Sequence, residues 1–355
     1  MIALGIETSC DETAAAVVEE TGDPRRPWRV RSNVVASQVA IHREWGGIVP
    51  ELSARQHIRD ICGVVDRALA DAGVDAYDAI AATQGPGLVG SLLVGLSFAK
   101  ALAWARAVPL VPVHHLAGHI ESLVLENGEM PLPAVVLVVS GGHTSLYRIG
   151  GPGAYELVGR TRDDAAGEAY DKVGKLLGLG YPGGPVIDRL ASEGDDRAVP
   201  FPKTRLTHAD RNAPHLPGVR DFSFSGLKTS VLRHVTRRRV ELGLPEGVAL
   251  PQQDVAGICA SFQRVVVETL LDRLFEAARS YGARSVGIAG GVSANSRLRA
   301  DAVARGAALD MPVFIPSLSL STDNAAMIAA AGLRRYRAGM TTDLDLNAEA
   351  SLVLS

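Results

Sequence analysis

Short apolar runs alternate with amphipathic stretches along the chain, a pattern typical of a mixed α/β protein. Residues 2–7 read as a buried strand, followed by a small polar turn and a second strand at residues 14–19. The same order returns at residues 134–139 and 145–149, again across a short turn of small residues. A repeated hairpin of this kind predicts a duplicated fold.

Helical periodicity separates the two hairpins. Residues 51–72 carry apolar positions at helical spacing and end at Gly73, and a strand is expected at residues 79–83. A glycine-rich stretch then leads into an almost wholly apolar helix at residues 91–104. Because a membrane span needs about 20 apolar residues, we expect this helix in a domain core.

The second half continues the mixed pattern. Residues 178–220 are rich in Gly, Pro and charge, which indicates loops around short helices. Further helices and strands are expected at residues 225–240, 254–281, 285–289 and 312–316. The last helix is expected at residues 323–337, which places Asp323 in its first turn.

Composition narrows the class of protein. The 355 residues, 47% of them hydrophobic, exceed what one core usually organises, so two domains are expected. A net charge of −3 argues against a surface that binds nucleic acid everywhere. Three cysteines without a Cys-x-x-Cys pair fit a reducing compartment. With neither a secretory signal nor a membrane span in the pattern, we expect a soluble, cytoplasmic protein.

A pair of histidines is the first candidate for chemistry. His115 and His119 are four positions apart, so one helical turn aims both imidazoles at the same place. Imidazole suits zinc, iron, copper or nickel, although such a pair also arises by chance or as hydrogen-bonding residues. The helix lacks the Glu that follows the first His in zinc proteases. Asp323 offers a carboxylate to complete a site, or else stabilises the start of its helix.

Small turns are the second candidate. The backbone amides of Ser140, Gly141 and Gly142 can approach phosphate oxygens, although a tight hairpin explains the same residues. Asp171 suits ribose hydroxyls or a solvated helix face. The glycine-rich stretch before residue 91 lacks the Lys of a phosphate-binding P-loop.

These motifs together resemble one family. They comprise residues 1–13, the two histidines, and residues 140–144, 171–174, 293–295 and 321–324. The chain resembles the bacterial TsaD family, the threonylcarbamoyl transferases of tRNA modification that were formerly described as O-sialoglycoprotein endopeptidases. The resemblance covers essentially the whole sequence.

The resemblance implies an α/β fold of the duplicated actin-like ATPase type (ASKHA, ribonuclease H-like), with two lobes around a nucleotide cleft. Residues 1–132 would form the N-terminal lobe, completed by a C-terminal helix at residues 323–345. Residues 133–322 would form the C-terminal lobe. The repeated hairpins agree with this duplication.

The resemblance also implies the site residues. His115, His119 and Asp323 would bind one divalent metal per subunit, Fe²⁺ or Zn²⁺. The adenylate substrate would contact Val138, Val139, Ser140, Gly141, Gly142, Asp171, Gly184, Asp188 and Asn295. Glu12 and His143 are candidates for the residue that takes up a proton.

The implied reaction transfers a threonylcarbamoyl group from threonylcarbamoyladenylate to the exocyclic amine of the adenosine 3′ of the anticodon, and releases AMP. The implied partners are tRNA, a TsaB-like paralogue and a TsaE-like ATPase, without a membrane. A candidate basic surface for tRNA, or alternatively a solvated helix face, comprises Arg233, Arg237, Arg238, Arg239, Arg297 and Arg299.

Three other readings compete with this one. An ATP-dependent kinase or ATPase of the same fold would share the nucleotide-binding features and differ in lacking the two-histidine, one-aspartate group. A non-catalytic scaffold is disfavoured by the intact motifs. A metallopeptidase is disfavoured by the missing glutamate.

Overall fold

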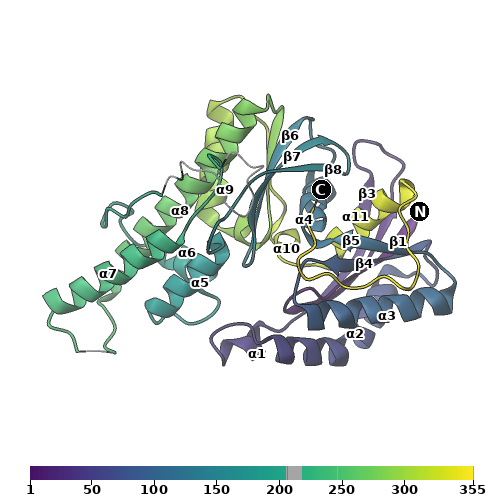
Figure 1. The fold of residues 1–355 in the computed structure, drawn as a ribbon, viewed down its shortest axis with the longest axis horizontal. Coiled ribbons are helices and arrows are strands. Elements are labelled where there is room, and N and C mark those ends of the chain that lie inside the picture. The colour runs from purple at the N-terminus through teal and green to yellow at the C-terminus, as the bar shows by residue number, and fades with distance from the viewer. Residues whose placement is uncertain (205, 207–217, 246, 355) are drawn as a thin grey trace. The chain divides into compact units, whose positions relative to one another are not determined.

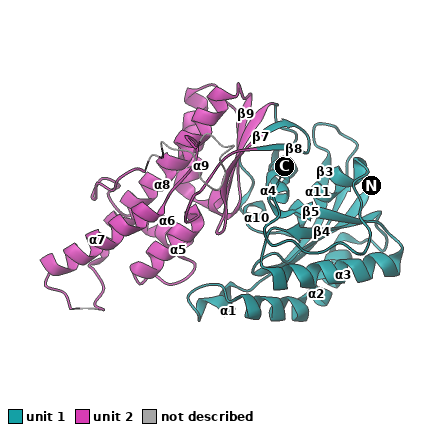
Figure 2. Ribbon diagram, in the orientation of Figure 1, with its two compact units in different colours: residues 1–132, 149–156, 314–355 teal, residues 133–148, 157–313 magenta. Residues whose placement is uncertain are grey.

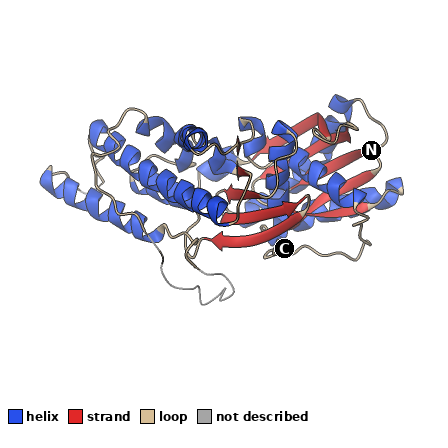
Figure 3. Cartoon of the chain, turned by 90° about the horizontal axis from the view of Figure 1, so that it is seen from above, coloured by secondary structure: helices blue, strands red, loops and turns tan. Residues whose placement is uncertain are grey.

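The computed structural model describes residues 1–204, 206, 218–245 and 247–354, and divides into two units (Figures 1 and 2). Unit 1 comprises Met1–Leu132, Ile149–Glu156 and Phe314–Ser355. Unit 2 comprises Pro133–Arg148 and Leu157–Val313. Unit 1 contains a five-stranded sheet and unit 2 contains most of a second five-stranded sheet. The sheets are covered by helices (Figure 3).

The first sheet has the strand order β3-β2-β1-β4-β5. Its strands are β1 (Ile2–Glu7), β2 (Glu12–Glu20), β3 (Trp28–Ser37), β4 (Ala79–Gly85) and β5 (Leu110–His114). β1 pairs antiparallel with β2 and parallel with β4, so the predicted N-terminal hairpin is confirmed. β3 and β5 were not predicted from the hydrophobic pattern.

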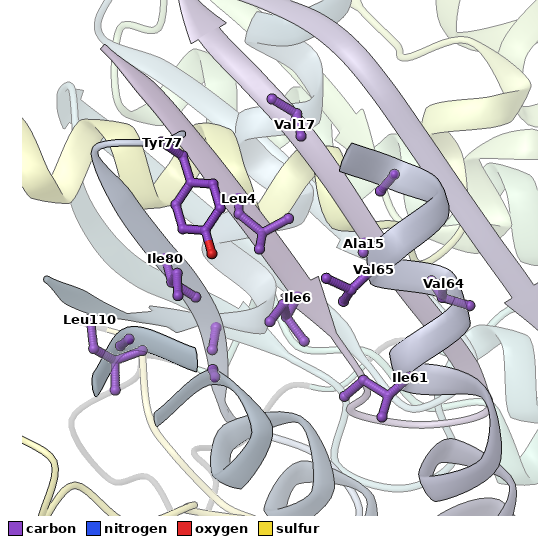
Figure 4. Packing of buried hydrophobic residues seen from close by; sticks show 14 of the residues in the cluster. Leu4, Ile6, Ala15, Val17, Ile61, Val64, Val65, Tyr77, Ile80 and Leu110 are labelled. Atoms are coloured by element: carbon purple, nitrogen blue, oxygen red, sulfur yellow. The ribbon is translucent and has the colours of Figure 1, made fainter. Parts of the chain in front are cut away.

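Successive side chains of β1 and β2 point to opposite faces of this sheet, and each face packs in a separate hydrophobic core. Leu4, Ile6 and Ala15 pack with residues of α2 (Pro50–Ala72) and α3 (Val89–Arg106), as Figure 4 shows for α2. Ala3, Ala14, Ala16 and Val18 pack on the other face with α11 (Ala325–Arg337). A Cβ on Gly5 would lie 2.3 Å from the Ala325 carbonyl oxygen, so this glycine permits close approach of α11 to β1.

The remaining helices of unit 1 are α1 (Val39–Arg43), α4 (His115–Asn127) and α10 (Leu318–Ser321). Within the described residues, α3 alone is long and apolar enough, by length and composition, to cross a membrane. It is longer than the predicted 91–104 helix. Because Leu92, Leu96, Ala99 and Ala103 are buried and most of these pack in the core beneath the sheet, α3 is a core helix.

The second sheet has the strand order β10-β9-β6-β7-β8. Its strands are β6 (Ala134–Val139), β7 (Thr144–Gly151), β8 (Ala154–Arg160), β9 (Ser285–Ala289) and β10 (Val313–Phe314). Counting strands within each unit, the first sheet read from β3 and the second sheet read from β8 both have the order third, second, first, fourth, fifth. The first and fourth strands are parallel in each. The predicted duplication is therefore present in the topology.

The helices of unit 2 are α5 (Ala166–Leu176), α6 (Gly183–Ala191), α7 (Ser225–Glu241), α8 (Gln252–Ser280) and α9 (Ser296–Ala308), with the short helix η1 (Gly291–Ala294). The predicted helices at 225–240 and 254–281 and the strand at 285–289 are confirmed. Part of the loop predicted over 178–220, namely residues 205 and 207–217, lies outside the described residues.

The C-terminal segment corrects two expectations. Asp323 was predicted in the first turn of the last helix, but α11 begins at Ala325 and Asn324 is its cap, accepting a hydrogen bond from the Met327 amide at 3.1 Å. The helix ends at Arg337, so a helix over 323–345 is too long. A positive φ of 73° at Gly339 turns the backbone away from helical geometry.

The division into units also differs from the expected lobe boundaries. Residues 314–322, grouped by sequence with residues 133–322, belong to unit 1. The reason is local: Asn127 on α4 donates to the Ile315 carbonyl at 3.3 Å, and Glu126 accepts from the Ser317 amide at 3.2 Å. The tip of the β7–β8 hairpin, Ile149–Glu156, also belongs to unit 1.

Candidate metal centre and nucleotide site

The two predicted histidines lie at the start of α4, immediately after β5. The His114 side chain caps this helix by accepting a hydrogen bond from the Leu116 amide at 3.1 Å. The next turn then places His115 and His119 on one face, where they are 5% and 0% exposed. Their rings meet edge to face, with centroids 4.7 Å apart.

Asp323 approaches both imidazoles from the segment between α10 and α11. Its Oδ1 lies 3.1 Å from His119 Nε2 and 3.6 Å from His115 Nε2. One ligand atom from each of the three residues lies within 4.8 Å of the others. The tertiary structure thus brings together the predicted two-histidine, one-aspartate group, hereafter the His–His–Asp group.

Glu7 holds the His115 ring of this group in place. Its Oε2 lies 3.0 Å from His115 Nδ1 and accepts a 2.7 Å hydrogen bond from the Thr83 hydroxyl. The Ser9 hydroxyl also lies 3.1 Å from His115 Nδ1. These contacts orient the ring and leave Nε2 facing Asp323, which is how carboxylates hold metal-binding histidines. The sequence interpretation missed Glu7, although a glutamate that ends a buried strand was a usable signal.

Nearby charges shift the pKa values of His115 and Glu7. Burial lowers the pKa of His115, but Asp323 and Glu7 outweigh burial and raise it to about 9. Burial raises the pKa of the Glu7 carboxyl, and the charge and hydrogen bond of His115 bring it below its usual value. The negative potential at this place therefore favours a positive charge.

His119 provides the test of whether a metal fits. Its Nδ1 and Nε2 are buried and have no hydrogen-bond partner among the described residues, because the approach to Asp323 lacks hydrogen-bond geometry. Buried polar atoms are seldom left without a partner. Two imidazoles and one carboxylate are donors that suit zinc or iron. The His–His–Asp group could hold a metal ion.

Glu12 lies close to this group. It begins β2, and burial together with Asp11, Asp323 and Glu7 raises the pKa of its carboxyl well above the usual value. The second candidate proton acceptor, His143, lies in unit 2 at the turn between β6 and β7. Only Glu12 therefore shares a unit with the His–His–Asp group.

The turn after β6 carries the predicted phosphate-binding residues. Val138 and Val139 end the strand, while Gly141 and Gly142 are exposed. The Ser140 amide is used within the turn, where it donates to the His143 carbonyl at 2.8 Å. A Cβ on Gly290 would lie 2.5 Å from the Val139 carbonyl oxygen, so this glycine lets the loop before η1 approach the same turn.

Asp171 and Gly184 meet where α5 and α6 touch. Asp171 Oδ1 accepts a 2.8 Å hydrogen bond from the Gly183 amide, next to Gly184 at the start of α6. A Cβ on Gly183 would lie 2.9 Å from the Asp171 Cα, so only glycine allows this contact. Asp171 is thus an anchor for α6 as well as an expected ribose contact.

Asp188 and Asn295 are joined directly. Asn295 Nδ2 donates to Asp188 Oδ1 at 3.1 Å, and its Oδ1 caps α9 by accepting from the Leu298 amide at 2.9 Å. Asp188 also accepts from the Ser296 amide at 3.0 Å and from the Ser296 hydroxyl at 2.8 Å. The predicted adenylate residues of unit 2 therefore form neighbouring contacts.

The candidate basic surface is partly used inside the protein. Arg238 pairs with Asp254 and Glu241, and Arg237 pairs with Glu241. Arg297 pairs with Asp196 and Asp301, and Arg299 donates to the Ser293 carbonyl. Arg233 is exposed. The positive charge available to tRNA here is smaller than the sequence suggests.

The topology and the His–His–Asp group define a class: an α/β protein of the actin-like ATPase fold that could hold a metal. The structure is similar to HypF from T. kodakarensis (TM-score 0.56, 15% identity) and to full-length HypF in the phosphate- and nucleotide-bound form (TM-score 0.59, 12% identity). The matches cover 97% and 95% of this chain but 49% and 46% of those chains, about half their length. These likenesses concern the fold.

Sequence comparison gives the family. Residues 29–330 match the TsaD family model, tRNA N6-adenosine threonylcarbamoyltransferase. Relatives of that description are 54% identical in Anaeromyxobacter dehalogenans, over 98% of this chain and 97% of the relative, and 47% identical in Koribacter versatilis, over 99% of each. The chain belongs to the TsaD family of tRNA N6-adenosine threonylcarbamoyltransferases. It is an enzyme that forms threonylcarbamoyladenosine in tRNA.

Proposed function

We propose that the enzyme takes the threonylcarbamoyl group from threonylcarbamoyladenylate and transfers it to adenosine 37, 3′ of the anticodon, in tRNAs that read codons beginning with A. The exocyclic amine of the adenosine attacks the carbamoyl carbon. The bond from that carbon to the phosphate oxygen breaks, and AMP leaves with the electron pair. The observation that carries the proposal is the buried His–His–Asp group in a chain of this family.

The donor is an activated anhydride, so the protein needs no nucleophile of its own. Its task is to hold the donor, orient a weakly nucleophilic amine and stabilise the charge that develops. Residues held by hydrogen bonds at the ends of strands and helices suit this task, because they need little reorganisation during the reaction.

One divalent ion, iron or zinc, would be held by His115, His119 and Asp323. His115 would use Nε2, because its Nδ1 faces Glu7 and Ser9. When bound, such an ion supplies Lewis acidity toward the carbamoyl or phosphoryl oxygens. Glu7 keeps the His115 ring in the orientation that this requires.

Unit 2 would bind the adenylate. The proposed contacts are Val138, Val139, Ser140, Gly141, Gly142, Asp171, Gly184, Asp188 and Asn295. The supporting observation is that the Gly290 loop approaches the end of β6, while Asp171 anchors α6 and Asp188 joins Asn295. The exposed Gly141 and Gly142 leave the backbone of the turn open to a phosphate.

Glu12 is the proposed acceptor for the proton of the attacking amine. A carboxyl with a raised pKa is a stronger base than an ordinary glutamate, and Glu12 interacts with the charge of Asp323. His143, the alternative, belongs to the turn that would face the phosphate. A pH profile of transfer by Glu12→Gln and His143→Gln separates the two, since only loss of the base removes the ascending limb.

The reaction would take place in the cytoplasm, with tRNA as acceptor. A TsaB-like paralogue and a TsaE-like ATPase are the proposed protein partners. Exposed apolar side chains on α3 support a protein partner, because Leu93 is 46% and Trp104 76% exposed on a helix whose other face lies in the core. The net charge of −3 supports partners that supply part of the tRNA surface.

One assay tests the proposal. Purified protein is mixed with synthetic threonylcarbamoyladenylate and tRNA, with and without both partners, and the digested nucleosides are measured by mass spectrometry. Formation of threonylcarbamoyladenosine with stoichiometric AMP is the expected result. No transfer under any combination of partners, together with ATP hydrolysis by the chain alone, would favour an ATPase of the same fold instead.

A further inference from the structure

We infer that Gln263, on α8, is a positioning residue for the adenylate site. Its carboxamide holds Asp188 and Asn295 in one arrangement, although it belongs to none of the motifs that suggested the family. The inference rests on the proposed function, in which Asp188 and Asn295 contact the adenylate. Beyond that function, it assigns to Gln263 the orientation of these two side chains.

Three side chains from three elements close a ring of hydrogen bonds. Gln263 Nε2 donates to Asp188 Oδ1 at 3.0 Å, and its Oε1 accepts from Asn295 Nδ2 at 2.9 Å. Asn295 Nδ2 completes the ring by donating to Asp188 Oδ1 at 3.1 Å. Gln263 is 3% exposed, so its bond to Asn295 is buried, while the bonds to the half-buried Asp188 lie at the edge of the site.

The ring has only one favourable polarity. Turning the Gln263 carboxamide over would place its oxygen against the Asp188 carboxylate and its NH₂ against the Asn295 NH₂. Both contacts would then be repulsive. The amide of Asn295 is fixed as well, because both of its N–H groups are used and its oxygen caps α9.

As a result, the two carboxylate oxygens of Asp188 accept different hydrogen bonds. Oδ1 accepts from Gln263, Asn295 and the Ser296 hydroxyl. Within the described part of the chain, Oδ2 accepts from the Ser296 amide alone. A carboxylate oxygen accepts two hydrogen bonds readily, so Oδ2 is the atom with capacity for a ribose hydroxyl. By engaging Oδ1, Gln263 orients Oδ2 for that contact.

The helix that carries Gln263 is a firm support. α8 is 29 residues long, and Phe262, the neighbour of Gln263, packs edge to face on Tyr170 with ring centroids 5.1 Å apart. Tyr170 in turn precedes Asp171, the other expected ribose contact. A single rigid helix thus lies behind both carboxylates.

The test compares two substitutions with a matched control. Gln263→Glu keeps the shape and the acceptor for Asn295 but sets a carboxylate against Asp188, and Gln263→Met removes both hydrogen bonds at similar size. Ser261→Ala is the control, because Ser261 is also buried on α8 but binds the segment at Asp195 and Val199 instead. Thermal melting, steady-state transfer and AMP binding by titration calorimetry are measured for all three.

We expect both Gln263 variants to raise the KM for the adenylate about tenfold, with kcat within about twofold of wild type. The Kd for AMP should rise by a similar factor, with the larger effect for Gln263→Glu. Ser261→Ala should lower the melting temperature without changing KM or Kd. Gln263 variants with wild-type KM and Kd, or whose losses only follow the melting temperature as in Ser261→Ala, would overturn the inference.

The same measurements separate this inference from the proposed function. If the wild-type protein binds AMP but does not transfer the group with any partner, the proposed reaction fails, and the change in AMP affinity still decides the role of Gln263. If the wild-type protein does not bind AMP, the positioning role is overturned as well.

Discussion

Two buried histidines in unit 1, His57 and His119, differ in whether their ring nitrogens have hydrogen-bond partners. His57 is fully buried, and its ring nitrogens contact the Thr13 hydroxyl at 2.8 Å and the Cys10 carbonyl at 3.0 Å. His119 is equally buried but has no hydrogen-bond partner among the described residues. A structural histidine satisfies its nitrogens within the protein. The ring nitrogens of His119 lack a hydrogen-bond partner among the described residues, so this is the histidine that suits a ligand.

This contrast gives a test at the scale of single residues. His115→Ala should reduce bound metal to a small fraction of one per chain and slow transfer roughly 100-fold, because one ligand and its link to Glu7 are lost. The melting curve should stay two-state. Metal content is measured by plasma mass spectrometry after extensive dialysis.

His57→Gln is the control, a buried histidine outside the His–His–Asp group. It should lower the melting temperature while keeping the metal. Unchanged transfer by His115→Ala in metal-stripped buffer would contradict a role for the metal.

At the scale of secondary structure elements, close packing between β1 and α11 limits what the sequence tolerates. A side chain at Gly5 would meet the Ala325 carbonyl oxygen at 2.3 Å and the Ala329 amide nitrogen at 2.8 Å, both of them backbone atoms that cannot rotate away. Alanines on α11 complete this contact. The small residues of β1 and α11 are thus selected by the distance between the two elements.

We expect Gly5→Ala to lower the free energy of unfolding by about 1–3 kcal/mol, because α11 must move away from β1. Gly63→Ala is the control in the same unit, since a Cβ at Gly63 on α2 meets nothing within 4 Å. That substitution should raise the free energy of unfolding by about 0.5–1 kcal/mol through helix propensity. Urea denaturation of both variants measures the difference, and equal effects would contradict the packing argument.

A loop in unit 2 gives a prediction for pH. Burial raises the pKa of the Asp164 carboxyl, but hydrogen bonds from Lys172 and Lys228 outweigh burial and bring it below its usual value. The folded state therefore binds this proton less readily than the unfolded state. The stabilisation is present above the unfolded pKa, about 3.9, and is lost as pH falls through the lower folded pKa.

The expected measurement is the difference in unfolding free energy between wild type and Asp164→Asn. It should be constant from neutral pH down to about pH 5 and should narrow as the pH falls below about 4. Acid titrations followed by circular dichroism test this window. A difference that stays constant to pH 2 would show that the two lysines contribute nothing through this carboxylate.

At the scale of the whole molecule, the chain combines two sheets of the same strand order with a C-terminal segment that returns to the first unit. This return is what brings Asp323 to the two histidines on α4. The outer face of α3 belongs to the same unit and remains exposed, with Leu93 and Trp104 on it. Assembly with a partner is the property to test at this scale.

Leu93→Glu should weaken binding of the proposed TsaB-like partner about 10- to 30-fold, because a charge would be buried in an interface centred on α3. The melting temperature of the isolated chain should hardly change, because the side chain is exposed. Val303→Glu on α9 is the matched control, an exposed apolar residue in unit 2. Analytical ultracentrifugation of each mixture gives the affinities, and equal weakening by both variants would argue against α3.

The fold was predictable where the local sequence pattern matches the final environment. β1, β6 and β9 read as apolar runs because both of their faces are covered. Helical spacing located α2, but of its apolar stripe Ile61 and Val65 are buried whereas Ile58 is 64% exposed. β3 was not predicted because the alternation that Trp28 to Arg31 begins is broken by Ser32-Asn33 and Val34-Val35, and the register against β2 also shifts next to Ser32. β5 was not predicted because Pro112 interrupts its short, five-residue apolar run.

The chemistry divides in the same way. The sequence by itself determined the helical spacing of His115 and His119, the small residues of the turns and, through its resemblance, the family and its expected site residues. Only the tertiary structure placed Glu7 next to His115, left the His119 ring nitrogens without a hydrogen-bond partner among the described residues, and closed the ring of Asp188, Gln263 and Asn295. Spacing describes neighbours along one helix or strand. Contacts between elements depend on how their buried faces pack, and local sequence does not contain that information.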